Sequence, residues 1–200
     1  MSKKIDKYKI LSLVLKNLRS EKDFNSCLSK TLTDLKLSET AKEKIVNEIA
    51  HDGINSFVLN INNFLNDELK KKIPQNFKNF RVNEKIRFLV ILRLKLIDEF
   101  FNKVDLVKLA LKQNSFVKLN QMIFNVSDEI WFLSGDTSTD FNYYSKRGIL
   151  MNIYSLSYLY NLNQEDFSKT EEFVNKQIDF TLRFGKVKSK FKKIFQSKVI

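Results

Sequence analysis

Residues 53–71, which read GINSFVLNINNFLNDELKK, show most clearly how this chain folds. Apolar side chains recur there at intervals of three or four residues, at Ile54, Phe57, Val58, Ile61, Phe64, Leu65 and Leu69. This spacing predicts an amphipathic α-helix with one face in a core. Helical spacing also dominates the rest of the sequence, and one Pro and four Gly in 200 residues leave few helix breakers. The sequence therefore predicts an all-α fold.

Three shorter helices are predicted before this segment. The first covers about residues 6–19, Asn25 or Ser26 caps the second, and the third runs through residue 49. Thr40 and Glu43 have the spacing of a capping box at the start of the third helix. Three short helices are typical of a helix-turn-helix unit, so residues 1–52 are predicted to form a head of that kind.

The body is predicted to cover residues 53–183. A loop surrounds Pro74, and a second loop covers residues 135–140. Five further helices are predicted at about residues 82–101, 104–111, 117–133, 141–162 and 167–183. Their many Phe, Ile, Leu and Met side chains fit either an ordinary core or an elongated apolar pocket, which sequence does not distinguish.

Residues 184–200 are predicted to form a separate basic amphipathic helix. Seven Lys or Arg and no acidic residue follow position 180, in a chain with a net charge of +12. On a helical wheel the apolar side is formed by Phe184, Val187, Phe191, Ile194 and Phe195, and the opposite side by Lys186, Lys190 and Lys193. Such a helix favours an anionic membrane surface, with a solvated tail or a helix folded onto the body as alternatives.

Several classes of function are disfavoured by composition. Cys27 and His51 are the only residues of their types, so we expect no disulfide framework, zinc site or Cys-His or Ser-His-Asp catalytic set. The expected third helix carries three Glu against two Lys, which disfavours contact with DNA phosphates. With no signal sequence or membrane span in view, a cytosolic or peripheral protein is expected.

Residues 131–147 read WFLSGDTSTDFNYYSKR and allow two interpretations. As a simple loop and helix start, Gly135 permits a tight turn, Asp136 forms an Asx-turn, and Thr139 or Asp140 caps the next helix. That interpretation does not explain why aromatic and cationic side chains are clustered at the start of the next helix, at Phe141, Tyr143, Tyr144, Lys146 and Arg147. Aromatic side chains beside cations suit an interaction surface or a headgroup site.

The same segment strongly resembles the signature of the ninth coenzyme Q biosynthesis protein family, roughly W, then G-D-x-S-T-D-x-N-(W/Y)-Y-(T/S)-(K/R)-R. Residues 35–38, 81–94 and 173–188 resemble other elements of that family in the same order. Tyr143 stands where many members have Trp, Gly148 replaces the usual Ala, and the family's F-P-x-G turn in the head is absent.

The resemblance implies a TetR-like homodimer that does not bind nucleic acid and is not itself an enzyme. Such proteins bind isoprenoid lipids, including ubiquinone intermediates, and present them to demethoxyubiquinone hydroxylase. No cofactor is expected besides the bound lipid or isoprenoid quinone. The expected location is cytoplasmic, peripheral on the inner face of a bacterial plasma membrane. The alternative function is a TetR-type transcriptional regulator with an apolar ligand pocket.

The resemblance also implies roles for particular residues. Arg147 occupies the position that contacts a phospholipid headgroup, which suits the forked guanidinium. The hydroxylase-facing patch would comprise Asp140, Tyr143, Tyr144 and Lys146. The lipid pocket would be lined by Leu119, Met122, Ile123, Val126, Ile130, Trp131, Leu150 and Tyr154.

Overall fold

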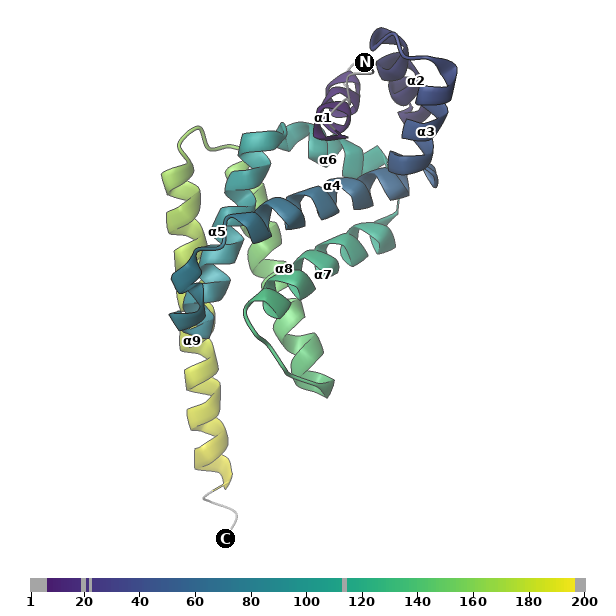
Figure 1. The fold of residues 1–200 in the computed structure, drawn as a ribbon. Helices are drawn as coiled ribbons and strands as arrows, with labels where there is room; N and C mark the ends of the chain where they lie inside the picture. Colours follow the sequence, from purple (N-terminus) through teal and green to yellow (C-terminus); the bar gives the residue numbers. More distant parts are fainter. Residues whose placement is uncertain (1–6, 19–20, 22, 113–114, 197–200) are drawn as a thin grey trace.

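The computed structural model describes residues 7–18, 21, 23–112 and 115–196, with side chains as far as Arg183. Its described part contains nine α-helices, one short 3₁₀ helix and no strand (Figure 1). This confirms the prediction of an all-α fold, and a small helical head on a larger helical body is consistent with a TetR-like arrangement.

The head consists of α1 (Lys7–Asn17), α2 (Phe24–Asp34) and α3 (Glu39–Ile49). Both predicted N-caps in the head are wrong. Asp23 caps α2, because its carboxylate accepts a hydrogen bond from the Ser26 amide at 2.9 Å. Ser38 caps α3 by accepting from the Ala41 amide at 3.4 Å, so the helix begins one residue before Thr40.

An aromatic cluster attaches the head to the body. The ring of Tyr8 in α1 stacks on Phe64 with 5.2 Å between centroids, and its edge meets Phe100 and Phe101 at 5.1 and 5.7 Å. The Tyr8 hydroxyl also donates to the backbone carbonyl of Phe100 at 2.9 Å. Offset and edge-to-face ring pairs add to the burial of their area, so this cluster fixes the position of α1 on the body.

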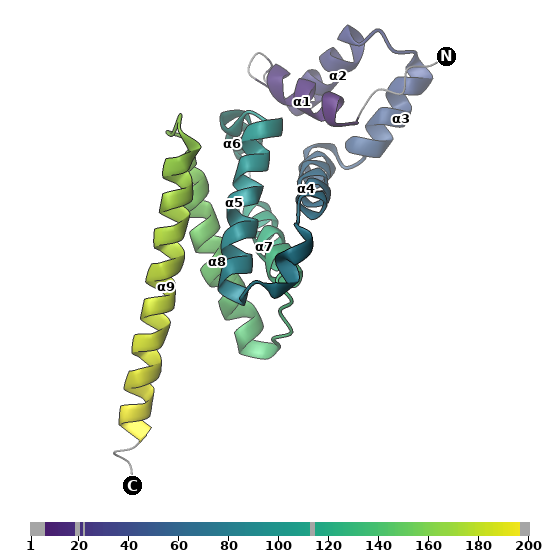
Figure 2. The same cartoon turned by 60° about the vertical axis from the view of Figure 1, so that its left-hand side comes forward.

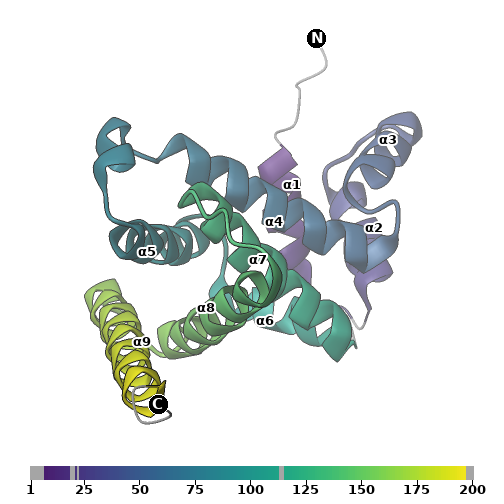
Figure 3. The ribbon, with the colours of Figure 1, turned by 90° about the horizontal axis from the view of Figure 1, so that it is seen from below.

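The body contains α4 (Gly53–Lys71), η1 (Gln75–Asn79), α5 (Val82–Phe100), α6 (Lys103–Lys112), α7 (Phe116–Leu133), α8 (Asp140–Asn161) and α9 (Phe167–Gln196). Helix α4 crosses α5 and α7, while α8 packs against both α7 and α9 (Figure 3). Apolar residues of α5, including Leu89, Val90 and Leu94, have no exposed surface. The core of the body therefore lies around α5, which packs against α4, α7 and α9.

Helix α9 differs from the prediction, because it is one continuous helix from Phe167 to Gln196 where two helices were expected. Gly185 lies inside it, at a cost of only about 1 kcal/mol relative to Ala. The C-terminal part of α9 extends beyond the other helices of the body (Figures 1 and 2). The side chains predicted to contact a membrane, from Phe184 onward, lie outside the described side chains. None of the described helices is long and apolar enough to span a membrane.

Candidate functional site

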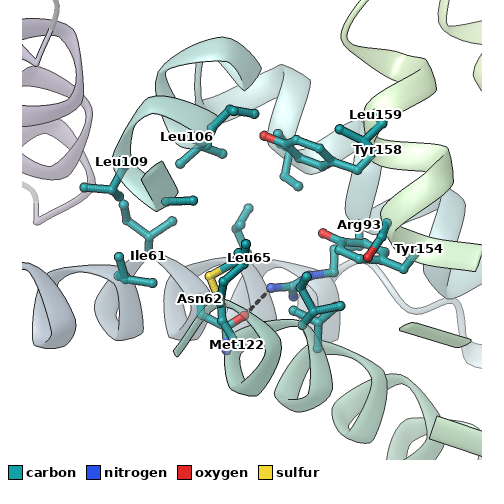
Figure 4. A pocket seen from close by; sticks show the side chains of 18 of the residues that line it. Ile61, Asn62, Leu65, Arg93, Leu106, Leu109, Met122, Tyr154, Tyr158 and Leu159 are labelled. Atoms are coloured by element: carbon teal, nitrogen blue, oxygen red, sulfur yellow. Dashed lines mark hydrogen bonds between the residues drawn. The ribbon is translucent and has the colours of Figure 1, made fainter. Parts of the chain in front are cut away.

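A cavity of about 340 Å³ lies between α4, α5, α6, α7 and α8 (Figure 4). Its wall is almost entirely apolar, and the few polar side chains in it include Asn62, Arg93 and Tyr158. Ligand pockets in proteins have this character, an apolar lining with a small number of placed polar groups. The cavity is therefore the first candidate for a binding site.

The structure brings five of the eight predicted pocket residues to this cavity: Leu119, Met122, Ile123, Val126 and Tyr154. The four from α7 have spacings of three and four residues, which place them on one face of the helix. Ile130 and Leu150 do not line the cavity, since both are buried in the core. Trp131 also lies elsewhere, where its indole N–H donates to the Lys146 carbonyl at 3.1 Å.

Most of the remaining wall comes from α4, α5 and α6, which were not predicted to contribute, and α8 adds residues beyond Tyr154. Helix α4 supplies Ile61 and Leu65, and α6 supplies Leu106 and Leu109. Tyr158 of α8 closes another part, and its hydroxyl donates to the Lys103 carbonyl at 2.8 Å. Burial raises the pKa of Tyr158 far above its usual value, so this phenol stays neutral. An apolar periodicity marks a helix face as buried but does not indicate whether that face meets a partner helix or a cavity.

The second candidate feature is the turn between α7 and α8, which a Schellman motif shapes. Gly135 has a φ of +83°, and its amide donates to the Phe132 carbonyl at 3.0 Å. The Asp136 amide donates to the Trp131 carbonyl at 3.1 Å. This pattern needs a residue with positive φ directly after the helix, which favours glycine. The motif turns Asp136 back toward the first turns of α8.

Asp136 lies at the centre of a partly buried ion-pair cluster. Its carboxylate accepts hydrogen bonds from Lys146 Nζ at 2.7 Å, Ser138 Oγ at 2.6 Å and Arg147 Nη1 at 3.1 Å. Burial alone would raise the pKa of Asp136, but these three hydrogen bonds outweigh it and hold the pKa well below its usual value. The predicted Asx-turn is present, because the Ser138 amide also points to this carboxylate at 3.4 Å.

Arg147 joins Asp136 to a second carboxylate. Its side chain is only 4% exposed, and its Nε lies 2.6 Å from Asp128 Oδ1. The guanidinium also lies over the ring of Tyr143, with Cζ 3.4 Å from the centroid. Two cations and two carboxylates thus balance within the cluster of Asp128, Asp136, Lys146 and Arg147. A lipid phosphate at Arg147 would have to compete with both carboxylates, and headgroup binding by Arg147 stays a prediction.

The predicted partner patch is divided by the structure into an inward and an outward part. Tyr143 points inward, where its hydroxyl donates to Asp128 at 2.9 Å. Tyr144 is 67% exposed and its ring edge rests on Tyr143, with 5.1 Å between centroids. Phe141, which the sequence noted beside the patch, is 81% exposed. The exposed aromatic surface of the first turn of α8 therefore consists of Phe141 and Tyr144.

The start of α8 differs from the predicted cap. Thr139 occupies the N-cap position without a side-chain hydrogen bond to the helix, and Asp140 has a φ of +54°. Asp140 is exposed, as expected for a patch residue. Lys146 points the other way, with its Nζ bound to Asp136 and 5.1 Å from the centroid of the Trp131 ring. Among the residues that the structure describes, no group of His, Cys, Asp or Glu side chains is placed to hold a metal ion.

Comparison with known proteins relates this region to one family. Residues 118–185 match the family model described as COQ9. The chain is 31% identical over 109 residues to a probable ubiquinone biosynthesis protein coq9, mitochondrial, of Dictyostelium discoideum. It is 33% identical over 79 residues to the ubiquinone biosynthesis protein COQ9, mitochondrial, of Rattus norvegicus. These alignments cover 53% and 38% of the chain but only 36% and 25% of the two relatives.

Proposed function

The chain belongs to the COQ9 family by the match of residues 118–185, and from this premise we propose that it acts in ubiquinone biosynthesis. The proposed activity is that of an accessory protein. It binds an isoprenoid lipid, such as a ubiquinone intermediate, and presents it to demethoxyubiquinone hydroxylase. The relatives are named as ubiquinone biosynthesis proteins, which supports the pathway.

The observation that carries the proposed lipid binding is the apolar cavity between α4 and α8. Its volume of about 340 Å³ lies within the range of small-molecule pockets, roughly 300–1,000 Å³. Burial of hydrocarbon contributes about 25 cal/mol per Å², so an isoprenoid chain would gain affinity from an apolar wall without directional contacts. The cavity lies against α7 and α8, the two helices that also carry the ion-pair cluster and the exposed aromatic surface.

We assign no catalytic step to this chain. Di-iron carboxylate sites in helical bundles take a Glu-x-x-His pair from each of two helices. The whole sequence contains one His, His51, in the turn before α4. The hydroxylation in our proposal is therefore done by the partner enzyme.

Membrane attachment and dimer formation complete the proposal. The seven basic residues after position 180 support peripheral binding to an anionic membrane, as does the extension of α9 beyond the body (Figure 2). Exposed apolar side chains on the last two helices, Ile149, Leu156 and Leu182, support a homodimer interface. Both remain separate from the cavity and can be tested independently.

Lipid binding is tested by purifying the protein from a bacterial host that makes ubiquinone and extracting it with organic solvent. Mass spectrometry of the extract should identify an isoprenoid quinone or quinone precursor at close to one molecule per chain. A protein that carries no lipid, and that also takes up none from vesicles containing ubiquinone, would contradict the proposed lipid binding.

Partner binding is tested with Tyr144→Ala. Truncation of a central interface aromatic costs about 2 kcal/mol or more, so affinity for the hydroxylase should fall roughly 30-fold. The variant should unfold at the same temperature as the wild type, because Tyr144 is mostly exposed. Phe180→Ala is the matched control, since it removes an equally exposed ring from α9. Equal loss of affinity in both variants would count against a hydroxylase site at the start of α8.

A further inference from the structure

Arg93 is an unusual residue in the wall of the cavity. It lies in α5 within an apolar run, and its side chain is 2% exposed. Figure 4 shows its guanidinium between Asn62 and Tyr154, at one side of a cavity whose other walls are mainly apolar. A full positive charge is thus buried where the surrounding side chains are mainly hydrocarbon.

The hydrogen bonds of Arg93 do not neutralise this charge. One terminal nitrogen donates to the Asn62 side-chain oxygen at 2.5 Å, and the other donates to Asn66. Both acceptors are neutral amides, and the buried Nε–H has no hydrogen-bond partner. No ion pair within the described residues includes Arg93, whereas Arg147 in the same body has two carboxylates.

Burial of an ionised group is costly unless it is paired with a countercharge and fully hydrogen-bonded. Arg93 therefore leaves this end of the cavity with an uncompensated positive charge. The Tyr154 phenol lies close to this guanidinium. Burial raises the pKa of Tyr154, and the charge of Arg93 together with a hydrogen-bonding interaction between the two side chains partly offsets this. Asn62, Arg93 and Tyr154 form what we call the polar end of the cavity.

We propose that Arg93 is the headgroup anchor of this cavity and takes an anionic oxygen of an amphiphilic ligand. The ligand's apolar chain would extend from the polar end along Leu65, Leu106 and Met122, which line the cavity. A charged oxygen beside the guanidinium would supply the countercharge that the described residues do not provide. This inference rests on the proposed lipid binding and specifies the chemistry of the ligand's head. It assigns to Arg93 the recognition that the family resemblance places at Arg147.

The test uses three probes and isothermal titration calorimetry at pH 8. Laurate carries a carboxylate, methyl laurate has the same chain without charge, and ubiquinone with two isoprene units is a neutral quinone. The wild type should bind laurate 10- to 100-fold more tightly than methyl laurate, the range expected for one charge-assisted hydrogen bond. This comparison needs no variant, so it does not depend on whether a mutant folds.

Arg93→Met removes the charge while keeping an unbranched apolar chain, and Arg93→Lys keeps the charge. The preference for laurate should fall to within about threefold in Arg93→Met and persist in Arg93→Lys. Equal binding of laurate and methyl laurate by the wild type would overturn the assignment, as would a preference that survives in Arg93→Met. If ubiquinone binds but laurate binds no more tightly than methyl laurate, the proposed lipid binding is supported and the role of Arg93 as headgroup anchor is contradicted. If none of the probes binds, both the lipid binding and the role of Arg93 are contradicted.

Discussion

Arg147→Met should lower the free energy of unfolding by about 3 kcal/mol at pH 7, which urea denaturation would measure. The substitution removes the guanidinium that joins Asp128 to Asp136. The Asp136 side chain is only 4% exposed and keeps its charge, since its pKa is held well below its usual value. When a buried carboxylate loses a charged partner, its desolvation cost is no longer fully offset. The expected loss of stability therefore exceeds that of a surface ion pair.

Two controls separate this effect from a general loss of packing. Asp128→Asn should cost less than about 1 kcal/mol, because Asp128 is 42% exposed and water can replace Arg147. The double variant Arg147→Met, Asp136→Asn should recover part of the loss, since it no longer leaves a charge buried. A loss below about 1 kcal/mol in Arg147→Met would mean that the cluster contributes little to folding and that Arg147 is available to a ligand.

This result bears on how the predicted headgroup role of Arg147 can be tested. A variant at this position could lose lipid or membrane binding because the α7–α8 turn has unfolded locally. Lipid binding by Arg147 variants is therefore informative only beside their unfolding free energies. A phosphate that bound Arg147 in place of Asp128 would leave the body's fold intact, because Asp128 is partly solvated.

The sequence predicted the α7–α8 turn well but not its ion pairs. Gly135 marks a turn because only a residue tolerant of positive φ ends a helix in a Schellman motif, and that preference is local. The contact between Arg147 and Asp128 joins residues 19 positions apart, and it depends on how α7 packs on α8. No spacing rule within one helix reports such a pair. The sequence indicated the group of aromatic and cationic residues between Phe141 and Arg147, but it did not indicate their carboxylate partners.

The cavity was predictable on one side only. Leu119, Met122, Ile123 and Val126 share a face of α7, and the resemblance drew attention to that helix. The opposite wall from α4 and α6 has the same apolar periodicity as any core helix, so nothing local distinguishes it. Arg93 did leave a local signal. It follows Leu89 by four residues and precedes Ile97 by four, so it occupies the buried face of α5, where a charge is exceptional.

Ala110→Phe should lower the affinity for ubiquinone with two isoprene units by at least roughly tenfold. Ala110 of α6 lines the cavity, and a phenyl ring there would take up space that a ligand chain needs. The free energy of unfolding should change by less than about 1 kcal/mol, since the ring enters an existing void and not a filled core. Calorimetric titration and urea denaturation of the same preparations would measure both quantities.

Ala110→Ser is the matched control, because it leaves the cavity volume nearly unchanged. The comparison with Arg93→Met separates the two parts of the site. Ala110→Phe should weaken laurate, methyl laurate and ubiquinone alike, since all three need the apolar volume. Arg93→Met should weaken laurate alone, because only laurate brings a charge to the polar end. Unchanged affinities in Ala110→Phe would place the bound chain outside this cavity, and the exposed apolar surface of α8 and α9 would become the site to test.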